Sequence, residues 1–222
     1  MTDAYAITTR TTPSRLPSRV SYDRAAVHAV LDEALVAHVG FVIDGSPVVL
    51  PLLHARVGDV LYLHGSAGAR VLRAARDGGM DVCVTVTLTD GLVLARSAFH
   101  HSINYRCVIA HGTATSVDSP TEKDAALTAL VEAAVPGRSV GTREPNRKEL
   151  AATTVLRLNL GEVSLKVRTG GPSDDPEDMD MPHWAGVLPL TTTPGRPQPA
   201  DDMPASTPTP AHVIDWRRPS PK

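Results

Sequence analysis

Short β-like segments separated by tight turns dominate the first 170 residues, and they restrict the fold of this chain more than any other feature. Residues 37–43, 48–57 and 61–64 are predicted strands, and Asp44-Gly45-Ser46-Pro47 and Gly58-Asp59 are predicted turns between them. Further strands are predicted at residues 80–88, 92–96, 107–117 and 154–168. About six strands joined by hairpins or short helices predict a mainly β fold, a closed or nearly closed antiparallel barrel. Strictly alternating β-α units are absent, which argues against a doubly wound sheet.

Helical periodicity is confined to a few segments. Residues 21–38 carry an apolar stripe, with Ser21 as the predicted cap, and residues 118–134 carry another. Residues 148–152 are predicted to add a short helical turn. These helices would pack on the outside of the barrel.

Residues 61–76, LYLHGSAGARVLRAAR, change from strand to helix within a few positions. Ser66 occupies the position of a helix cap, and Arg70 lies one turn into the helix. Free N–H groups at a helix start attract anions, so this pattern indicates a phosphate-binding site. An ordinary capped helix with a solvated arginine explains the pattern equally well.

Composition excludes several classes of function. The formal charge of −2 over 222 residues and the 4% aromatic content give no support to nucleic-acid or membrane-surface binding. Apolar runs are too short to span a membrane, and the N-terminal residues lack the apolar core of a signal peptide, so a cytoplasmic location is expected. Cys83 and Cys107 read as buried free thiols, and the nine histidines show no metal-ligand spacing, so no metal site is predicted.

The two ends of the chain differ from its middle. Residues 1–20 are predicted to be a flexible arm, 21–170 the folded domain, and 171–222 a proline-rich acidic tail. Twelve of the 19 prolines lie in that tail. Residues 183–190, HWAGVLPL, are its apolar part and are expected to dock on the body, with Trp184 as an anchor or as a cover for the edge of a bound group.

Four short stretches, taken in order, carry a family resemblance. They are SPVVLPLL at residues 46–53, LYLHGS at 61–66 with Arg70, FHHSINYR at 99–106 and KVRTGGP at 166–172. Together they resemble the pyridoxamine 5'-phosphate oxidase-like FMN-binding split barrels, in the flavin-nucleotide-binding branch related to nitroimidazole-resistance reductases. The resemblance covers roughly residues 20–190. It implies a six-stranded antiparallel Greek-key split barrel with peripheral helices, and a homodimer that binds FMN at the subunit interface.

The resemblance also implies roles for individual residues. Residues that would lie along the flavin ring are Val49, Leu50, Pro51 and Leu52. Residues that would hold the ribityl phosphate are His64, Gly65, Ser66 and Arg70. Residues that would line the same cleft or the dimer seam are Ser102, Asn104, Tyr105 and Arg106. The substrate would meet His101, Asn104 and Tyr105. The oxidase's paired basic residues beside Ser66 and its vitamin-phosphate pocket are not recognisable, which argues against pyridoxamine phosphate as the substrate.

Several of these residues have a plainer interpretation. His100 and His101 would point to opposite faces of a strand, so at least one is expected to be structural, while the other could polarise a substrate or bind haem. Arg106 is either a solvated strand-entry residue or an oxyanion ligand. Lys166 and Arg168 form either a solvated face or a basic rim that attracts an anionic substrate or a reduced cofactor.

The sequence therefore predicts an FMN-dependent oxidoreductase acting on a small organic molecule. Electrons would come from a reduced nicotinamide or deazaflavin at the open face of the flavin, because no Rossmann-type glycine motif is present. The alternative is a protein that binds flavin or haem for storage or sensing without turnover. Fold alone does not separate the two.

Overall fold

The computed structural model describes residues 3–67, 72, 75 and 78–217 of the chain. Its strands are β1 (Val20–Ser21), β2 (Val36–Ile43), β3 (Ser46–Val57), β4 (Val60–Ser66), β5 (Met80–Leu94), β6 (Ser102–Ser116), β7 (Thr153–Asn159), β8 (Glu162–Arg168) and β9 (Gly186–Pro189). The α-helices in the described residues are α1 (Arg24–Glu33), α3 (Pro120–Ala134), α4 (Arg147–Ala152) and α5 (Ala211–Ile214). Short 3-10 turns include η1 (Pro17–Arg19), η2 (Ala98–His100), η3 (Ser139–Gly141) and η4 (Pro176–Asp178).

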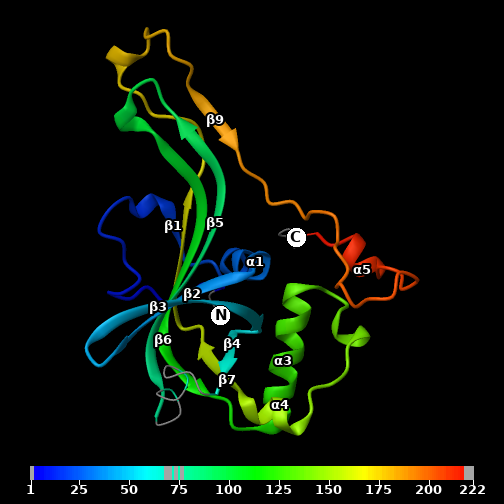
Figure 1. Cartoon of the computed structure of the whole chain (residues 1–222). Coiled ribbons are helices and arrows are strands. Elements are labelled where there is room, and N and C mark those ends of the chain that lie inside the picture. Colours follow the sequence, from blue (N-terminus) through cyan, green and yellow to red (C-terminus); the bar gives the residue numbers. More distant parts are fainter. Residues whose placement is uncertain (1–2, 68–71, 73–74, 76–77, 218–222) are drawn as a thin grey trace.

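The strands form one antiparallel sheet that closes on itself. In the described residues the strand order is β1-β8-β6-β7-β4-β3-β2-β5-β9, and β6 also pairs with β5. That additional pairing joins β2 to β7 into a ring of six strands, with β1, β8 and β9 attached outside it (Figure 1). The predicted mainly β split-barrel fold with peripheral helices is confirmed, as an irregular ring rather than a regular barrel.

Aliphatic side chains fill the ring, as the low aromatic content requires. The largest fully buried ones come from α1, β4 and β7 and include Leu31, Leu61, Leu63, Leu156 and Leu158. Helix α1 packs against β3, β6 and β8, and α3 packs against β3, β4 and β7. The helices therefore cover the ring from outside, as predicted.

Turn and cap chemistry explains where the predicted elements begin and end. The β2–β3 hairpin turns at Asp44 and Gly45, which both have positive φ (51° and 76°), as a two-residue hairpin turn requires. Asp23, rather than Ser21, caps α1 by accepting a hydrogen bond from Ala26 N at 2.7 Å. The helix ends at Glu33, earlier than predicted, because the β-branched run from Val36 pairs with β3 instead.

The predicted turn at residues 89–91 is wrong, because β5 runs through it. Its partner β6 also begins five residues earlier than predicted and includes the polar segment 102–106. A register shift between Thr89 and Gly91 absorbs the turn-like sequence as a β-bulge within the ladder. Gly91 leaves room for β9, since a Cβ there would lie 3.1 Å from Leu188 O.

The far end of the β5–β6 hairpin projects from the ring, and β9 adds a third strand to it (Figure 1). We call residues 89–106 together with β9 the hairpin extension. Asp174 fastens the segment before β9 to it: its buried carboxylate accepts hydrogen bonds from Arg96 N (2.9 Å) and from the Arg96 guanidinium (3.0 Å). Within the predicted 183–190 segment, residues 186–189 pair with β5, while Trp184 lies against Gly186 and stays largely exposed.

Both ends of the chain contact the body. Tyr5 is buried, and its hydroxyl contacts His28 Nε2 (2.9 Å) and Asp59 Oδ1 (3.1 Å), which fixes this part of the predicted flexible N-terminal arm. At the other end, Trp216 Nε1 donates to Ala134 O (2.9 Å) at the end of α3. The proposed domain boundaries themselves stay a prediction. Among the described residues, the helices are too short or too polar to cross a bilayer.

Buried His54 generates a testable pH dependence. It lies on β3, its Nε2 contacts Leu31 O (2.9 Å), and burial holds its pKa below the ordinary value of 6.5. Below about pH 6.5, His54 binds a proton in the unfolded chain more readily than in the folded protein. The free energy of unfolding therefore falls as the pH drops. This contribution is complete above pH 6.5 and is lost below it by up to about 1.4 kcal/mol per pH unit.

We expect His54→Gln, which keeps a donor for Leu31 O but does not titrate, to flatten the decline in stability between pH 6.5 and 5. Urea unfolding at several pH values measures the slope. His183→Asn is the control, because His183 is exposed, and it should leave the slope unchanged. An unchanged slope in His54→Gln would contradict the assignment.

Candidate functional site

A cavity of about 670 Å³ lies where α3 and residues 139–145 face β4. This volume falls within the usual range for ligand pockets. Much of its wall is apolar, contributed by β3, by α3 and by the segment after α3. These side chains are Leu53, Leu127, Leu130, Val131, Val140 and Pro145.

His64 of β4 is the ionisable ring in this cavity wall. It is half-buried, and its Nδ1 atom is buried without a hydrogen-bond partner among the described residues. Burial lowers its pKa below 6.5, so the neutral imidazole is favoured at pH 7. A neutral ring with an unsatisfied buried nitrogen pays a desolvation cost that a metal or a donor group would remove.

The remaining wall of the cavity is polar. It includes Asp124 and Thr128 of α3 and the Arg143–Glu149 ion pair, whose Nη2 and Oε1 atoms lie 2.7 Å apart. Glu149 also completes the capping box of α4 by accepting from Asn146 N. The polar wall is therefore held by local structure around α4.

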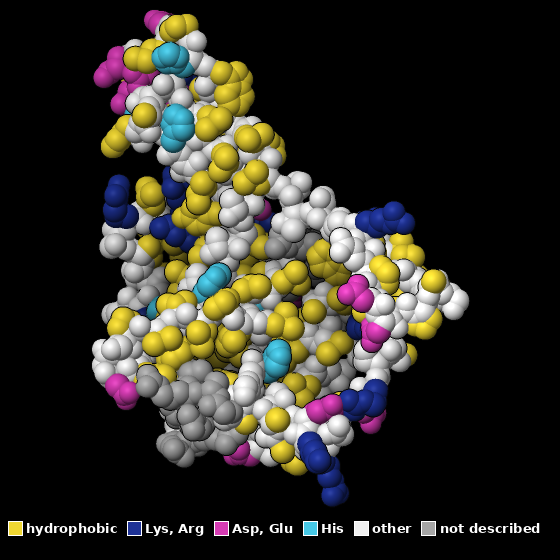
Figure 2. All heavy atoms as spheres, in the orientation of Figure 1, with side chains coloured by type: hydrophobic (Ala, Val, Ile, Leu, Met, Phe, Trp, Pro, Cys, Tyr) yellow, Lys and Arg dark blue, Asp and Glu magenta, His cyan; other side chains and the backbone are white. Residues whose placement is uncertain are grey.

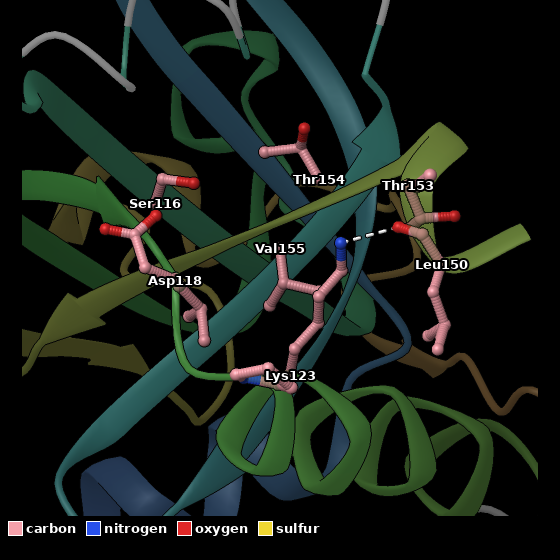
Figure 3. Close-up of a pocket in the computed structure, with 10 residues that line it drawn as sticks. Ser116, Asp118, Lys123, Leu150, Thr153, Thr154 and Val155 are labelled. Atoms are coloured by element: carbon pink, nitrogen blue, oxygen red, sulfur yellow. Dashed lines mark hydrogen bonds between the residues drawn. The ribbon is translucent and has the colours of Figure 1, made fainter. Parts of the chain in front are cut away.

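A second pocket, about 420 Å³, lies at the start of α3 (Figure 3). Lys123 extends across it and donates from Nζ to Leu150 O at 2.6 Å, and Ser116, Asp118 and Thr153 line its walls. Thr153 pairs with Ser66 at the end of β4. This pocket therefore adjoins the stretch in which the sequence predicts a phosphate cradle.

The predicted phosphate-binding residues are only partly described. β4 continues through Gly65 and Ser66, so Ser66 pairs with Thr153 as a strand residue, where the sequence predicts a helix cap. Gly65 makes room for Leu72, because a Cβ there would lie 2.6 Å from the leucine Cδ1. Arg70 lies outside the described residues, so the cradle stays a prediction.

The predicted ring-binding residues, 49–52, lie on β3 in the part that pairs with β2 on one side. Among described strands, β4 joins β3 only from His54 onward, so residues 46–53 have one open edge. In the register of this two-residue hairpin, Val49 directs its backbone N–H and C=O to that edge, while Pro51 offers only its C=O. Such an edge is suited to bind a planar heteroaromatic ring, in agreement with the predicted role.

The other predicted residues lie on the hairpin extension, and two of them hold internal structure. Asn104 is buried, accepts a hydrogen bond from Arg168 and donates to Gly170 O at 3.1 Å. Arg106 is bound by two carboxylates: it donates to Glu33 of α1 and, through Nε and Nη2, to Asp90 at 3.0 and 2.8 Å. These bonds raise the Arg106 pKa and neutralise its charge, which favours a structural role over oxyanion binding.

Arg168 has a different environment from Arg106. It is buried, and it donates hydrogen bonds to neutral oxygens of Asn104, Gly170 and Gly171. Burial lowers its pKa, with a further contribution from nearby Arg19. Tyr105 is half-buried and pairs with Arg168 across the β6–β8 ladder, whereas His101 is exposed and Ser102 begins β6.

The structure does not bring all the predicted site residues together within one chain. β2 pairs with β5 at residues 83–85, whereas Ser102 pairs with Val93. Along β5, residue 84 and Val93 are therefore roughly 30 Å apart, at about 3.3 Å per residue. The predicted ring and phosphate residues thus lie at the ring of strands, and His101 and Ser102 lie on the hairpin extension.

Sequence reasoning missed much of the cavity wall. Residues 139–145 lie between the two helical segments predicted at 118–134 and 148–152, and α3 was predicted only as a packing helix. Nothing in their pattern indicates which strand they face. Glu33 was also missed, although a carboxylate at the end of an apolar stripe is a signal for a buried ion pair with an arginine such as Arg106.

The chain is similar to several known proteins. Residues 23–167 match the family model described as pyridoxamine 5'-phosphate oxidase. The flavocytochrome Anf3 from Azotobacter vinelandii is 38% identical over 95% of this chain and 97% of that chain, with a TM-score of 0.88. The FAD and heme binding protein from Mycobacterium smegmatis is 42% identical over 88% of this chain and 95% of that chain, with a TM-score of 0.84.

A putative 5-nitroimidazole antibiotic resistance protein from Bacteroides thetaiotaomicron is 20% identical over 67% of this chain and 86% of that chain, and its TM-score of 0.55 shows a shared fold. No curated protein matches this chain. The family model covers more than half of the chain, and the two similar structures span nearly all of it. The chain therefore belongs to the pyridoxamine 5'-phosphate oxidase-like, flavin-binding family whose motifs it carries.

Proposed function

We propose that this protein is a redox protein that binds a flavin and a haem, with the haem in the cavity beside His64. The observation that carries the proposal is the unpartnered Nδ1 of a half-buried, neutral histidine in the wall of a large, mainly apolar cavity. Imidazole is a common axial ligand of haem iron. The two similar structures at 38% and 42% identity, a flavocytochrome and an FAD- and haem-binding protein, support this combination.

The residues present fit a haem in several respects. The leucine and valine side chains of α3 and β3 suit the apolar macrocycle. His64 would hold the iron, and the surrounding aliphatic wall would exclude water. The haem, when bound, supplies one-electron chemistry, and the chain supplies its position and its dielectric.

The flavin would occupy the open edge of β3 at residues 49–52. The sequence predicts FMN, and the 42% identical relative binds FAD. Both share the isoalloxazine ring that the backbone of β3 would contact and a phosphate that Ser66 and Arg70 would hold. Chromatography of the flavin released from the purified protein distinguishes FMN from FAD.

The flavin is proposed to accept electrons from a reduced nicotinamide or deazaflavin, and a small organic molecule is the proposed acceptor. Storage or sensing without turnover is the second candidate, favoured if Arg106 and Asn104 serve only the internal structure described above. Anaerobic addition of NADH, NADPH or a reduced deazaflavin separates the two. Bleaching of the flavin band supports the oxidoreductase, and a flavin that none of these donors reduces supports the binding protein.

The haem assignment makes a direct prediction. Replacement of His64 by Ala removes the imidazole and should reduce haem content at least about tenfold, because axial ligation anchors the iron. The absorbance ratio of the haem Soret band to protein measures the loss. Flavin content should stay near the wild-type value.

His38→Ala is the matched control, since His38 is an exposed histidine on β2, which β3 separates from β4, and it should retain haem. Loss of flavin with haem retained in His64→Ala would instead place His64 in the flavin phosphate cradle. That result would overturn the proposed haem site.

We also propose a homodimer in which the hairpin extension of one chain packs on the second copy. Leu92, Ile103 and Leu188 on the extension are 36–50% exposed, and Val42 and Val49 on β2 and β3 are more than 60% exposed. Burying both surfaces in one interface would be favourable, and a twofold dimer buries them in pairs. It would also bring His101 and Ser102 close to the flavin edge of the partner.

Light scattering should give about twice the 23.5 kDa mass of one chain. Ile103→Asp should shift the protein toward monomer and lower flavin content, because a charge would be buried in the seam. Val57→Asp, at an exposed position next to the β3–β4 turn, serves as the control. An Ile103→Asp protein that stays dimeric with full flavin content would contradict this interface.

A further inference from the structure

The tip of the hairpin extension brings together three side chains of metal-ligand type. His100 ends η2, at the connection between β5 and β6, and Asp175 and Asp178 belong to the turn around η4. A nitrogen or oxygen atom of each lies within 4.8 Å of the others. Figure 2 shows acidic and histidine side chains gathered at this end of the molecule.

Local backbone geometry places the two carboxylates side by side. Asp175 is the cap of η4 and Asp178 is its last residue, and Asp178 N donates to Asp175 O at 3.0 Å. In a 3-10 turn, side chains three residues apart lie above one another. The acids therefore point to the same side, where their charges repel unless a cation lies between them.

Independent contacts hold the two segments together. Asp174, next to Asp175, is buried and accepts hydrogen bonds from the backbone N–H of Arg96 and from its guanidinium. On the other side of the site, the His100 ring packs edge-on against Phe99 at 5.2 Å, and its Nε2 lies 3.1 Å from Asp175 Oδ2. These contacts position His100 and Asp175 before any ion binds, which lowers the entropy cost of binding.

We infer that His100, Asp175 and Asp178 form a site for a divalent transition-metal ion such as zinc. One imidazole and two carboxylates are ordinary zinc ligands, and water completes a tetrahedral shell in sites with three protein ligands. Two ligands of one zinc ion lie at most about 4.2 Å apart, since each is about 2.1 Å from the metal. Side-chain movements of about 1 Å would therefore bring all three ligand atoms to bonding distance of one ion.

The inferred ion has a structural consequence for the segment before β9. It would tie residues 175–178 to the connection between β5 and β6, next to the Asp174–Arg96 pair, and so support the pairing of β9 with β5. The site is separate from the cavity at His64 and from β3. It does not depend on the proposed flavin and haem function.

Isothermal titration of the full chain with zinc chloride, after treatment with a chelator, tests the inference. We expect one saturable site per chain, and Asp178→Asn or His100→Gln should weaken it at least about tenfold. Asp180→Asn and His101→Gln are matched controls: Asp180 is an acid two residues from Asp178, and His101 instead contacts Ser97 O through Nδ1 (3.0 Å). Both controls should bind zinc as the unchanged protein does.

Hydrogen exchange provides a second readout. Zinc should slow exchange in residues 171–185 of the unchanged protein and have no such effect in Asp178→Asn. The absence of a saturable site, or equal zinc affinity in all four variants, would overturn the inference and leave only a His100–Asp175 ion pair. Flavin and haem content should be the same in Asp178→Asn and Asp180→Asn as in the unchanged protein.

Discussion

The pairing of β6 on both of its sides is the constraint on which the rest of the structure depends. Along one side it pairs with β5 over nearly the whole length of both strands. Along the other it pairs with β8 through residues 105–111 and then with β7 at residues 115–116. Because β6 pairs with β5, β7 and β8, the ring of strands closes around the core. The same strand also continues beyond the ring as half of the hairpin extension.

Ion pairs between charged side chains also connect the hairpin extension to the ring. Arg106 leaves β6 at the level where the ring ends and binds Glu33 of α1 as well as Asp90 of β5. Removing Arg106 would leave the two partly buried carboxylates of Glu33 and Asp90 uncompensated, which is more costly than the cluster is stabilising. Arg168 connects β8 to Asn104 through neutral acceptors. The polar residues that resembled a binding motif therefore fasten the extension to the ring.

Local patterns predicted the ring well and its connections poorly. The hairpin at Asp44-Gly45, the helix capped by Ser119 and the helical turn at 147–152 follow from residue-level chemistry. The sequence Thr89-Asp90-Gly91 was predicted as a turn because local propensity favours one there, but long-range pairing with β6 converts it into a bulge. Residues 102–106 are polar yet form a strand for the same reason. Pairing partners that are distant in sequence leave no periodic signal.

His64 shows that the surroundings of a site residue, like strand pairing, depend on segments that are distant in sequence. Alternation along β4 correctly places Leu61 and Leu63 in the core and His64 on the other face. What lies against that face depends on α3, which begins 56 residues later in the chain and has no local relation to β4. The resemblance assigned His64 to a phosphate, whereas the cavity beside it is largely aliphatic and its arginine, Arg143, is already paired with Glu149. A bare anion there would lack a free cation among the described lining residues, which makes its burial costly. A neutral imidazole with an open nitrogen suits a metal-centred apolar ligand in the same space. The geometry of the cavity wall therefore supports the proposed haem, rather than a phosphate, as the group that His64 would contact.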